Sequence, residues 1–371
     1  MSAKLLYFVT EDWYFCSHRL ALAVAAREAG FDVTVVTRVR EHGETIRLAG
    51  LALVPFDISR SGMNPVYELM TLWRLYGVYR RTCPDVVHNV AMKPVLYGSL
   101  AARLAGVRGV VNALAGMGWL FTSAGGRARV IKHWVRVALG RLLTRGIAIV
   151  QNPDDAKFLS RLGVPRDQIR RISGAGVDLV RFQPGPEPIG VPLVVLPARL
   201  LWDKGVGEFV QAALILRSLA VRARFVLVGD PDPANPASVP AAQVADWVQS
   251  GAVEHWGWSN DMPGVFTRAH VVCLPSYREG LPKALIEAAA CARPIVTTDV
   301  PGCREVVRNG ENGLLVGERD PLALAQALRY LIENRGAREE MGKRGREIAL
   351  AEFSSEKIIT ETLAVYRELV P

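Results

Sequence analysis

The chain alternates short apolar runs with longer amphipathic stretches from one end to the other. This alternation is typical of a parallel sheet covered by helices, and so predicts the α/β class. The stretch 19–29 has a helical pattern, and Gly30 is placed to end it as a C-cap glycine. The predicted strands are Leu5–Thr10, Asp32–Thr37, Leu51–Phe56, Val86–His88, Gly109–Leu114, Ile147–Gln151, Leu193–Pro197, Arg224–Val228, Ala252–Trp256, Val271–Leu274, Pro294–Thr297 and Gly313–Val316.

One segment interrupts the alternation: "QPGPEPIGVP" (residues 183–192) holds four prolines and two glycines. Such a composition predicts a linker, and 371 residues are too many for one ordinary core. We therefore expect two doubly wound, Rossmann-like domains facing a central cleft. Residues 1–184 form the first domain, 185–353 the second, and 354–371 a further helix. In such sheets, ligands bind outside the carboxyl ends of the strands.

Charge is distributed unevenly between the predicted domains. Residues 1–184 hold 25 Lys and Arg against 13 Asp and Glu, and no acidic residue lies between Asp85 and Asp154. The excess indicates an anionic partner, which is a membrane surface, a phosphorylated acceptor or a nucleic acid. RNA-type stacking motifs are absent from the sequence, so we expect no nucleic acid partner.

The sequence also argues against two other classes of protein. No apolar run is long enough to span a membrane, and the N-terminus lacks the pattern of a signal peptide. The five cysteines show no metal-ligand spacing, which indicates reduced thiols in the cytoplasm and no zinc site.

The stretch "SYREGLPKALIEAAACARPIV" (residues 276–296) follows a predicted strand and turns into a predicted helix. Pro282 suits the first helical position, and the amides of Gly280 and Leu281 can face an anion such as a diphosphate. Glu279 would repel that anion, so we expect its carboxylate to bind hydroxyl groups. Glu287, deeper in the helix, could accept two ribose hydroxyl hydrogen bonds.

Two cations follow the first strand of the second domain in "ARLLWDKG" (residues 198–205). Arg199 offers a planar fork and Lys204 a point charge, which together suit a diphosphate. Alone, the pair is equally typical of solvated surface charge. Beside the glutamate helix, it favours an anion site.

These motifs together resemble the family 4 nucleotide-sugar glycosyltransferases of the GT-B fold. "PGCREVVRNGENGLLV", "EDWYFCSHRLALAVAA" and "AMKPVLYGSLAARLAGV" extend the resemblance over nearly the whole chain. It implies that Arg199 and Lys204 neutralise the donor diphosphate, that Glu279 holds the transferred sugar and Glu287 the ribose. It also implies retention of anomeric configuration, no metal or other cofactor, and a C-terminal helix (354–371) returning toward the first domain.

The chain is most similar to members that extend an undecaprenyl-diphosphate-linked sugar with an N-acetylhexosamine such as GalNAc. The resemblance therefore implies a UDP-sugar as co-substrate and a lipid-linked, polyprenyl diphosphate saccharide as acceptor. It also implies a cytoplasmic enzyme attached peripherally to the inner membrane.

One loop departs from the family pattern, because "NALAGMG" has Ala115 where many members have histidine. Backbone around Gly116 and Gly118 could replace that contact, or the two glycines form only a tight turn. Further acceptor-side candidates in the first domain are His18, Asn89 and Lys93. A structural role is an equally good interpretation of His18.

The stretch "GGRARVIKHWVRVALGRLLTRG" (residues 125–146) has apolar residues at helical spacing, Trp134 among them, and Arg129, Lys132 and Arg136 mostly off that line. It is either a helix covering the sheet or a helix that binds an anionic membrane surface. Both interpretations remain open from the sequence.

The sequence offers less support for functions other than sugar transfer. "DPDP" (residues 230–233) contains the Asp-x-Asp of a metal site, but its prolines favour a turn. A nucleotide-sugar epimerase of GT-B type needs an acid/base pair that the sequence does not offer. A non-catalytic membrane-associated protein would have little reason to keep Glu279, Arg199 and Lys204 together. Transfer to a soluble acceptor is a further alternative.

Overall fold

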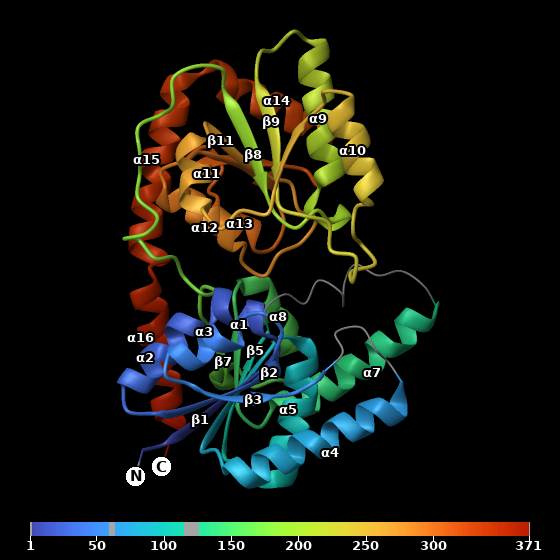
Figure 1. Cartoon of the computed structure of the whole chain (residues 1–371), viewed down its shortest axis with the longest axis vertical. Helices are drawn as coiled ribbons and strands as arrows, with labels where there is room; N and C mark the ends of the chain where they lie inside the picture. Colours follow the sequence, from blue (N-terminus) through green and yellow to red (C-terminus); the bar gives the residue numbers. More distant parts are fainter. Residues whose placement is uncertain (1, 59–63, 115–125, 371) are drawn as a thin grey trace. The chain divides into compact units, whose positions relative to one another are not determined.

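The computed structural model describes residues 2–58, 64–114 and 126–370, without the side chains of Pro65 and residues 126–134. Two compact units divide the chain. Met1–Ala175 and Glu356–Pro371 form the first unit, and Gly176–Ser355 forms the second. Each unit contains one parallel sheet with helices on both faces, as the alternation of the sequence predicts (Figure 1).

The sheet of the first unit has seven parallel strands in the order β3-β2-β1-β4-β5-β6-β7. Six of them confirm predicted strands. The seventh, β7, was missed, because three residues that include two arginines carry no apolar signature. The strands are β1 (Lys4–Glu11), β2 (Asp32–Arg38), β3 (Ala52–Pro55), β4 (Val86–Val90), β5 (Gly109–Ala113), β6 (Ile147–Val150) and β7 (Ile169–Arg171).

Alternate residues of β1 enter different cores. Tyr7 packs with one set of helices, and Phe8 with the other. On the Tyr7 face lie α1 (Asp12–His18), α2 (Leu20–Glu28), α3 (Gly43–Leu48) and α16 (Ser355–Leu369). On the opposite face lie α4 (Pro65–Thr82), α5 (Met92–Ala105), α7 (Gly126–Leu143) and α8 (Pro153–Arg161).

A buried polar group joins the C-terminal helix to the first sheet. The hydroxyl of Tyr366 in α16 lies 2.9 Å from that of Tyr7 and 2.5 Å from Nδ1 of His88. Burial and the charge of Arg19 hold the pKa of His88 well below its usual value, so this imidazole stays neutral. The last helix is therefore part of the core of the first unit.

The sheet of the second unit has six parallel strands in the order β10-β9-β8-β11-β12-β13. All six confirm predicted strands to within two residues. They are β8 (Leu193–Pro197), β9 (Arg224–Val228), β10 (Glu254–Gly257), β11 (Val271–Leu274), β12 (Ile295–Thr298) and β13 (Gly313–Val316). One face carries α9 (Val206–Ser218), α10 (Ala241–Gln249) and α14 (Pro321–Glu333). The other carries α11 (Met262–Arg268), α12 (Lys283–Ala290), α13 (Cys303–Val306) and α15 (Arg335–Glu352).

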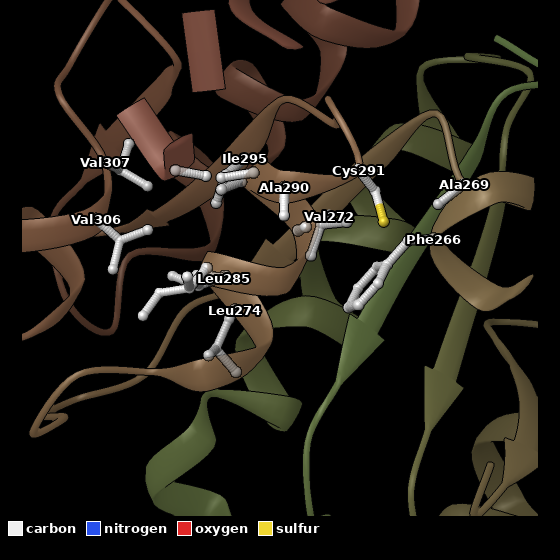
Figure 2. Packing of buried hydrophobic residues seen from close by; sticks show 14 of the residues in the cluster. Phe266, Ala269, Val272, Leu274, Leu285, Ala290, Cys291, Ile295, Val306 and Val307 are labelled. Atoms are coloured by element: carbon white, nitrogen blue, oxygen red, sulfur yellow. The ribbon is translucent and has the colours of Figure 1, made fainter. Parts of the chain in front are cut away.

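Helix α12 is anchored by the apolar core of the second unit. Leu285 and Ala290 point from the helix into a cluster with Leu274 of β11 and Ile295 of β12 (Figure 2). All four side chains are buried, so a shift of the helix would open cavities. The core therefore fixes the position of the functional residues that precede α12 and lie on it.

The composition of the proline-rich segment 183–192 predicted a linker between the domains. In the structure, this segment is part of the second unit. Glu187 forms two hydrogen bonds with Arg338 of α15, at 2.6 and 2.8 Å. Arg293 donates to the carbonyls of Gly185 and Pro186, and the imidazole of His270 bonds that of Pro188. The chain enters the second unit earlier, between Ala175 and Gly176. Proline content indicates a stiff, irregular segment, whereas these distant partners decide which unit it joins.

Candidate active site

The loops that carry the predicted donor-site residues follow three neighbouring strands of the second unit. Arg199 and Lys204 follow β8, residues 275–282 follow β11, and residues 299–302 follow β12. Because β8, β11 and β12 are adjacent and parallel, these loops meet at the carboxyl edge of the sheet. The two segments with predicted site residues are thus brought to one place, together with residues 299–302.

Lys204 and Glu279 are in direct contact. The Nζ of Lys204 lies 2.5 Å from Oε1 of Glu279, and the hydroxyl of Ser276 donates to the same oxygen at 2.7 Å. The side chains of Lys204 and Glu279 are only 19% and 12% exposed. Such a pair is screened little by solvent, so the lysine charge and the carboxylate hold each other in place. Ser276 was missed by the sequence analysis, although it begins the very motif that contains Glu279.

Two glycines allow these loops to approach each other. At Gly205 (φ +72°), a Cβ would lie 2.1 Å from the carbonyl oxygen of Pro275. At Gly302 (φ +86°), it would lie 2.6 Å from the carbonyl oxygen of Glu279. Any larger residue would force the backbones apart, so both positions require glycine. The sequence signal was present in "DKG" and "PGC", but a glycine after a strand is also typical of any turn.

Arg199 pairs with a carboxylate other than Glu279. Its Nη1 donates to Oδ2 of Asp232 at 2.7 Å. Asp232 belongs to the "DPDP" segment, and Ser238 holds its backbone amide at 2.9 Å. The prediction of a turn was therefore incomplete, since this turn also orients one of the two cations.

The residues between β11 and α12 form a tight, buried turn. Gly280, Leu281 and Pro282 are all buried, and α12 begins at Lys283. We predicted Pro282 as the first residue of the helix, but it is the N-cap. Its carbonyl accepts from the amide of Leu285 at 3.0 Å, which starts the helical hydrogen bonding one residue later.

Glu287 lies in the second turn of α12 and is only 7% exposed. Burial raises the pKa of its carboxyl group above the ordinary 4.5, while Lys283, 3.5 Å away, and Arg181 oppose this shift. The carboxylate is therefore kept in an environment that disfavours its charge. Such a cost is typical of a group retained for function.

We expect Glu287→Gln to leave the melting temperature equal or higher while raising the KM for a nucleotide-sugar donor about tenfold. A raised pKa means that the folded state binds the proton more tightly than the unfolded state. The carboxylate therefore costs stability as the pH rises from about 4.5 through the folded pKa, and Gln removes that cost. Thermal melts across this pH range test the stability arm, and initial rates test the KM. A lower melting temperature at neutral pH, or an unchanged KM, would contradict the assignment.

Tyr277 was not predicted but lies among the same loops. Its backbone amide donates to the carbonyl of Asp203 at 2.9 Å, one residue before Lys204. Its hydroxyl donates to Glu208 at 2.7 Å, and the guanidinium of Arg319 lies 4.6 Å from the ring centre. Burial and the bond to Glu208 raise the pKa of Tyr277. Tyr277 therefore positions the loop of Lys204, and nothing in its local sequence marks that role.

Two acceptor-side candidates of the first unit, His18 and Lys93, contact other side chains of that unit. His18 ends α1 with its ring stacked on Tyr14, at 4.3 Å between centroids. Lys93, in the first turn of α5, pairs with Glu68 at 2.8 Å. Gly116 and Gly118 lie outside the described residues, as does Ala115.

Asn89 is buried inside the first unit. Its side chain is fully buried, donates to Asn112 at 2.9 Å and accepts from Tyr79 at 3.3 Å. These bonds join β4 to β5 and α4, which is a structural role, and an acceptor contact by Asn89 stays a prediction. The sequence showed only that Asn89 follows His88 at a strand end, whereas β4 continues to Val90.

The predicted membrane residues lie on α7. The side chains of Arg129, Lys132 and Trp134 fall outside the described part of the structure. Arg136 is half-buried, and its guanidinium lies 5.8 Å from the ring centre of Phe158 in α8. Arg136 therefore packs within its own unit. No helix in the described ranges is long and apolar enough to cross a membrane.

No cluster of three or more His, Cys, Asp or Glu within residues 2–58, 64–114 and 126–370 could hold a metal ion. Lys204 and Arg199 supply positive charge at the candidate site.

Comparison with known proteins places this site in a family. The profile described as "Glycosyl transferases group 1" matches residues 191–334, and that described as "Glycosyl transferase 4-like" matches residues 4–146. The N,N'-diacetylbacillosaminyl-diphospho-undecaprenol alpha-1,3-N-acetylgalactosaminyltransferase of Campylobacter jejuni is 27% identical, over 95% of each chain. The UDP-Gal:alpha-D-GlcNAc-diphosphoundecaprenol alpha-1,3-galactosyltransferase of Escherichia coli is 27% identical over 71% of this chain and 70% of that protein.

Among solved structures, a sucrose-phosphate synthase from Thermosynechococcus elongatus superposes with a TM-score of 0.80 at 21% identity, covering 99% of each chain. This likeness shows the shared fold, with two Rossmann-like parallel-sheet domains of GT-B type. Together the two family profiles cover most of the chain, one in each half. The chain belongs to the group 1, family 4-like glycosyltransferases of the GT-B fold.

Proposed function

We propose that this glycosyltransferase moves an N-acetylhexosamine such as GalNAc from a UDP-sugar to a polyprenyl diphosphate-linked saccharide, with retention of configuration. The names of the two relatives support the lipid-linked acceptor, and one of them names a UDP-sugar donor. The positive charge of the first half suits an acceptor that carries a diphosphate at an anionic membrane surface. The enzyme then works in the cytoplasm, attached peripherally to the inner membrane.

The contacts of Glu279 with Lys204 and with Ser276 are the observation that carries this proposal. A donor diphosphate offers Lys204 a second anionic partner. As the lysine turns toward the diphosphate, Oε1 of Glu279 keeps the Ser276 hydroxyl and can accept a hydroxyl group of the transferred sugar in place of the lysine. One cluster thus binds the leaving group and the sugar on either side of the bond that breaks.

Transfer requires negative charge on the departing UDP to be stabilised. Lys204 and Arg199 supply fixed positive charge for this step, so the proposal needs no metal ion. In a front-face transfer, the acceptor hydroxyl attacks the anomeric carbon on the side from which UDP leaves, and its proton passes to the departing diphosphate oxygen. Configuration is then retained without a nucleophile from the enzyme.

A transfer assay with a lipid-linked saccharide and a panel of UDP- and GDP-sugars tests the proposal. We expect UDP release that depends on the acceptor, resists EDTA, and yields a product whose anomeric configuration matches the donor by NMR. Thermal shifts identify the donor, since a ligand at 100 times its Kd stabilises the folded state by about 2.7 kcal/mol. Donor turnover without any acceptor would contradict transfer to the lipid-linked saccharide. Inversion of the anomeric configuration would contradict retention, and loss of activity in EDTA would contradict transfer without a metal ion.

A further inference from the structure

Helix α4 presents an apolar face to solvent. The side chains of Val66, Leu69, Met70 and Trp73 are 68%, 57%, 58% and 61% exposed. Their spacing places them on one face of the helix. The opposite face is buried against the first sheet, as the low exposure of Leu75 shows. Contiguous exposed apolar side chains of this size are typical of an interaction surface. We call these four residues the α4 face.

The charges around the α4 face are positive. Arg80 and Arg81 continue the same side of the helix toward its C-terminal end, and both are exposed. Glu68 is the only acidic residue in the sequence of α4, and it points to the other side, where its carboxylate pairs with Lys93. The surface thus runs from apolar to basic without a carboxylate, which complements a partner that is apolar and anionic.

The place of the α4 face in the fold connects it with the acceptor side. In a parallel sheet, each covering helix begins near the carboxyl edge, where the preceding strand ends. The apolar turns of α4 lie in its N-terminal half, beside the start of α5 (Figure 1). The ion pair between Glu68 of α4 and Lys93 of α5, at 2.8 Å, joins the two helices there. Lys93 is itself an acceptor-side candidate. A lipid-linked acceptor would present its diphosphate at this edge, a step that rests on the proposed function.

We propose that the α4 face inserts into the interfacial layer of an anionic bilayer. The aromatic ring of Trp73 suits the depth of the head groups, and Arg80 and Arg81 suit anionic lipid phosphates. A second copy of the chain fits less well. A two-fold contact between α4 helices would bury these arginines with no carboxylate on the face to pair with them. This proposal assigns the membrane contact to α4 and not to α7, for which the sequence left a membrane contact open.

Liposome co-sedimentation of the full chain tests this assignment. Vesicles of phosphatidylethanolamine with phosphatidylglycerol should bind the wild-type protein, and phosphatidylcholine vesicles should not. The triple variant Leu69→Gln, Met70→Gln, Trp73→Gln should lower the partition coefficient at least about tenfold, because it removes the inserted apolar surface. The double variant Arg80→Glu, Arg81→Glu should bind anionic vesicles less tightly, and its binding should depend less on salt concentration than that of the wild type.

The matched control is Leu48→Gln with Leu104→Gln, which removes exposed leucines of α3 and α5 outside the α4 face. This control should bind vesicles as the wild type does, and circular dichroism should show every variant folded. All variants should keep donor binding and transfer to a water-soluble acceptor analogue. If the wild type does not transfer sugar to that analogue, the proposed function fails, whereas the vesicle result still tests the α4 face independently.

Four outcomes would overturn the α4 assignment. The triple variant could bind vesicles like the wild type, or the wild type could fail to bind anionic vesicles at low salt. Binding could instead fall only when Arg129, Lys132 and Arg136 of α7 are changed to Glu. A wild-type dimer in light scattering that the triple variant makes monomeric would identify the face as an interface between copies.

Discussion

Glu279→Ala is expected to lower kcat about a hundredfold while the protein remains folded. Removing one charged hydrogen-bonding group that acts mainly in the transition state costs on the order of 3 kcal/mol. The carboxylate also holds Lys204, with Nζ at 2.5 Å from Oε1, in the structure. Its loss frees the lysine for the donor diphosphate, so the donor KM should stay equal or fall. A decrease in kcat without an increase in KM separates this role from simple donor binding.

Two further variants sharpen the test of Glu279. Ser276→Ala removes the 2.7 Å hydrogen bond to the same oxygen and should cost less, since the carboxylate remains. Glu254→Ala is the matched control, because it removes a carboxylate paired with Arg224 at 2.7 Å in the same unit. It should leave kcat unchanged. A folded Glu279→Ala protein with nearly normal turnover would defeat the assignment.

Lys204→Ala and Arg199→Ala are each expected to weaken donor binding and turnover about 10- to 100-fold. A hydrogen bond to a charged group contributes about 1.5–3 kcal/mol, and a diphosphate accepts from both cations. Their effects should not add, because both act on the same bound anion. Each cation has a carboxylate partner of its own in the structure, Glu279 for Lys204 and Asp232 for Arg199. Their effects on the free energy of unfolding should therefore add.

A double-mutant cycle for donor binding and one for stability can be measured on the same four proteins, which are the wild type, the two single variants and the double variant. Titration calorimetry with UDP gives the binding cycle, and urea unfolding without ligand gives the stability cycle. Asp232→Asn is the matched control for Arg199, since it removes the partner but keeps the cation. Additive effects on UDP binding would show that the two cations do not share one anion, and the diphosphate assignment would fail.

The sequence by itself determined the architecture and the edge at which the candidate site lies. The alternation of apolar runs predicted twelve strands, all of which formed, because most of them are buried on both faces and burial leaves a local signature. Gly30 ends α2 with a φ of +96°, as its position after a helical pattern predicted. Motifs placed directly after strands also had to meet at one edge once the strands were parallel. The missed strand β7 had no apolar residues beyond Ile169 to mark it.

The tertiary structure alone decided which of these residues touch. Lys204 and Glu279 are 75 positions apart and Arg199 and Asp232 are 33 apart, so their pairing depends on strand order and loop path. For the same reason, only the fold shows that Asn89 bonds Asn112 and Tyr79 and that the α4 face is exposed. Local sequence encodes backbone preference and burial period over a few residues, whereas contacts between distant side chains exist only after the sheets have assembled. The residue types at the site could therefore be predicted, but their partners could not.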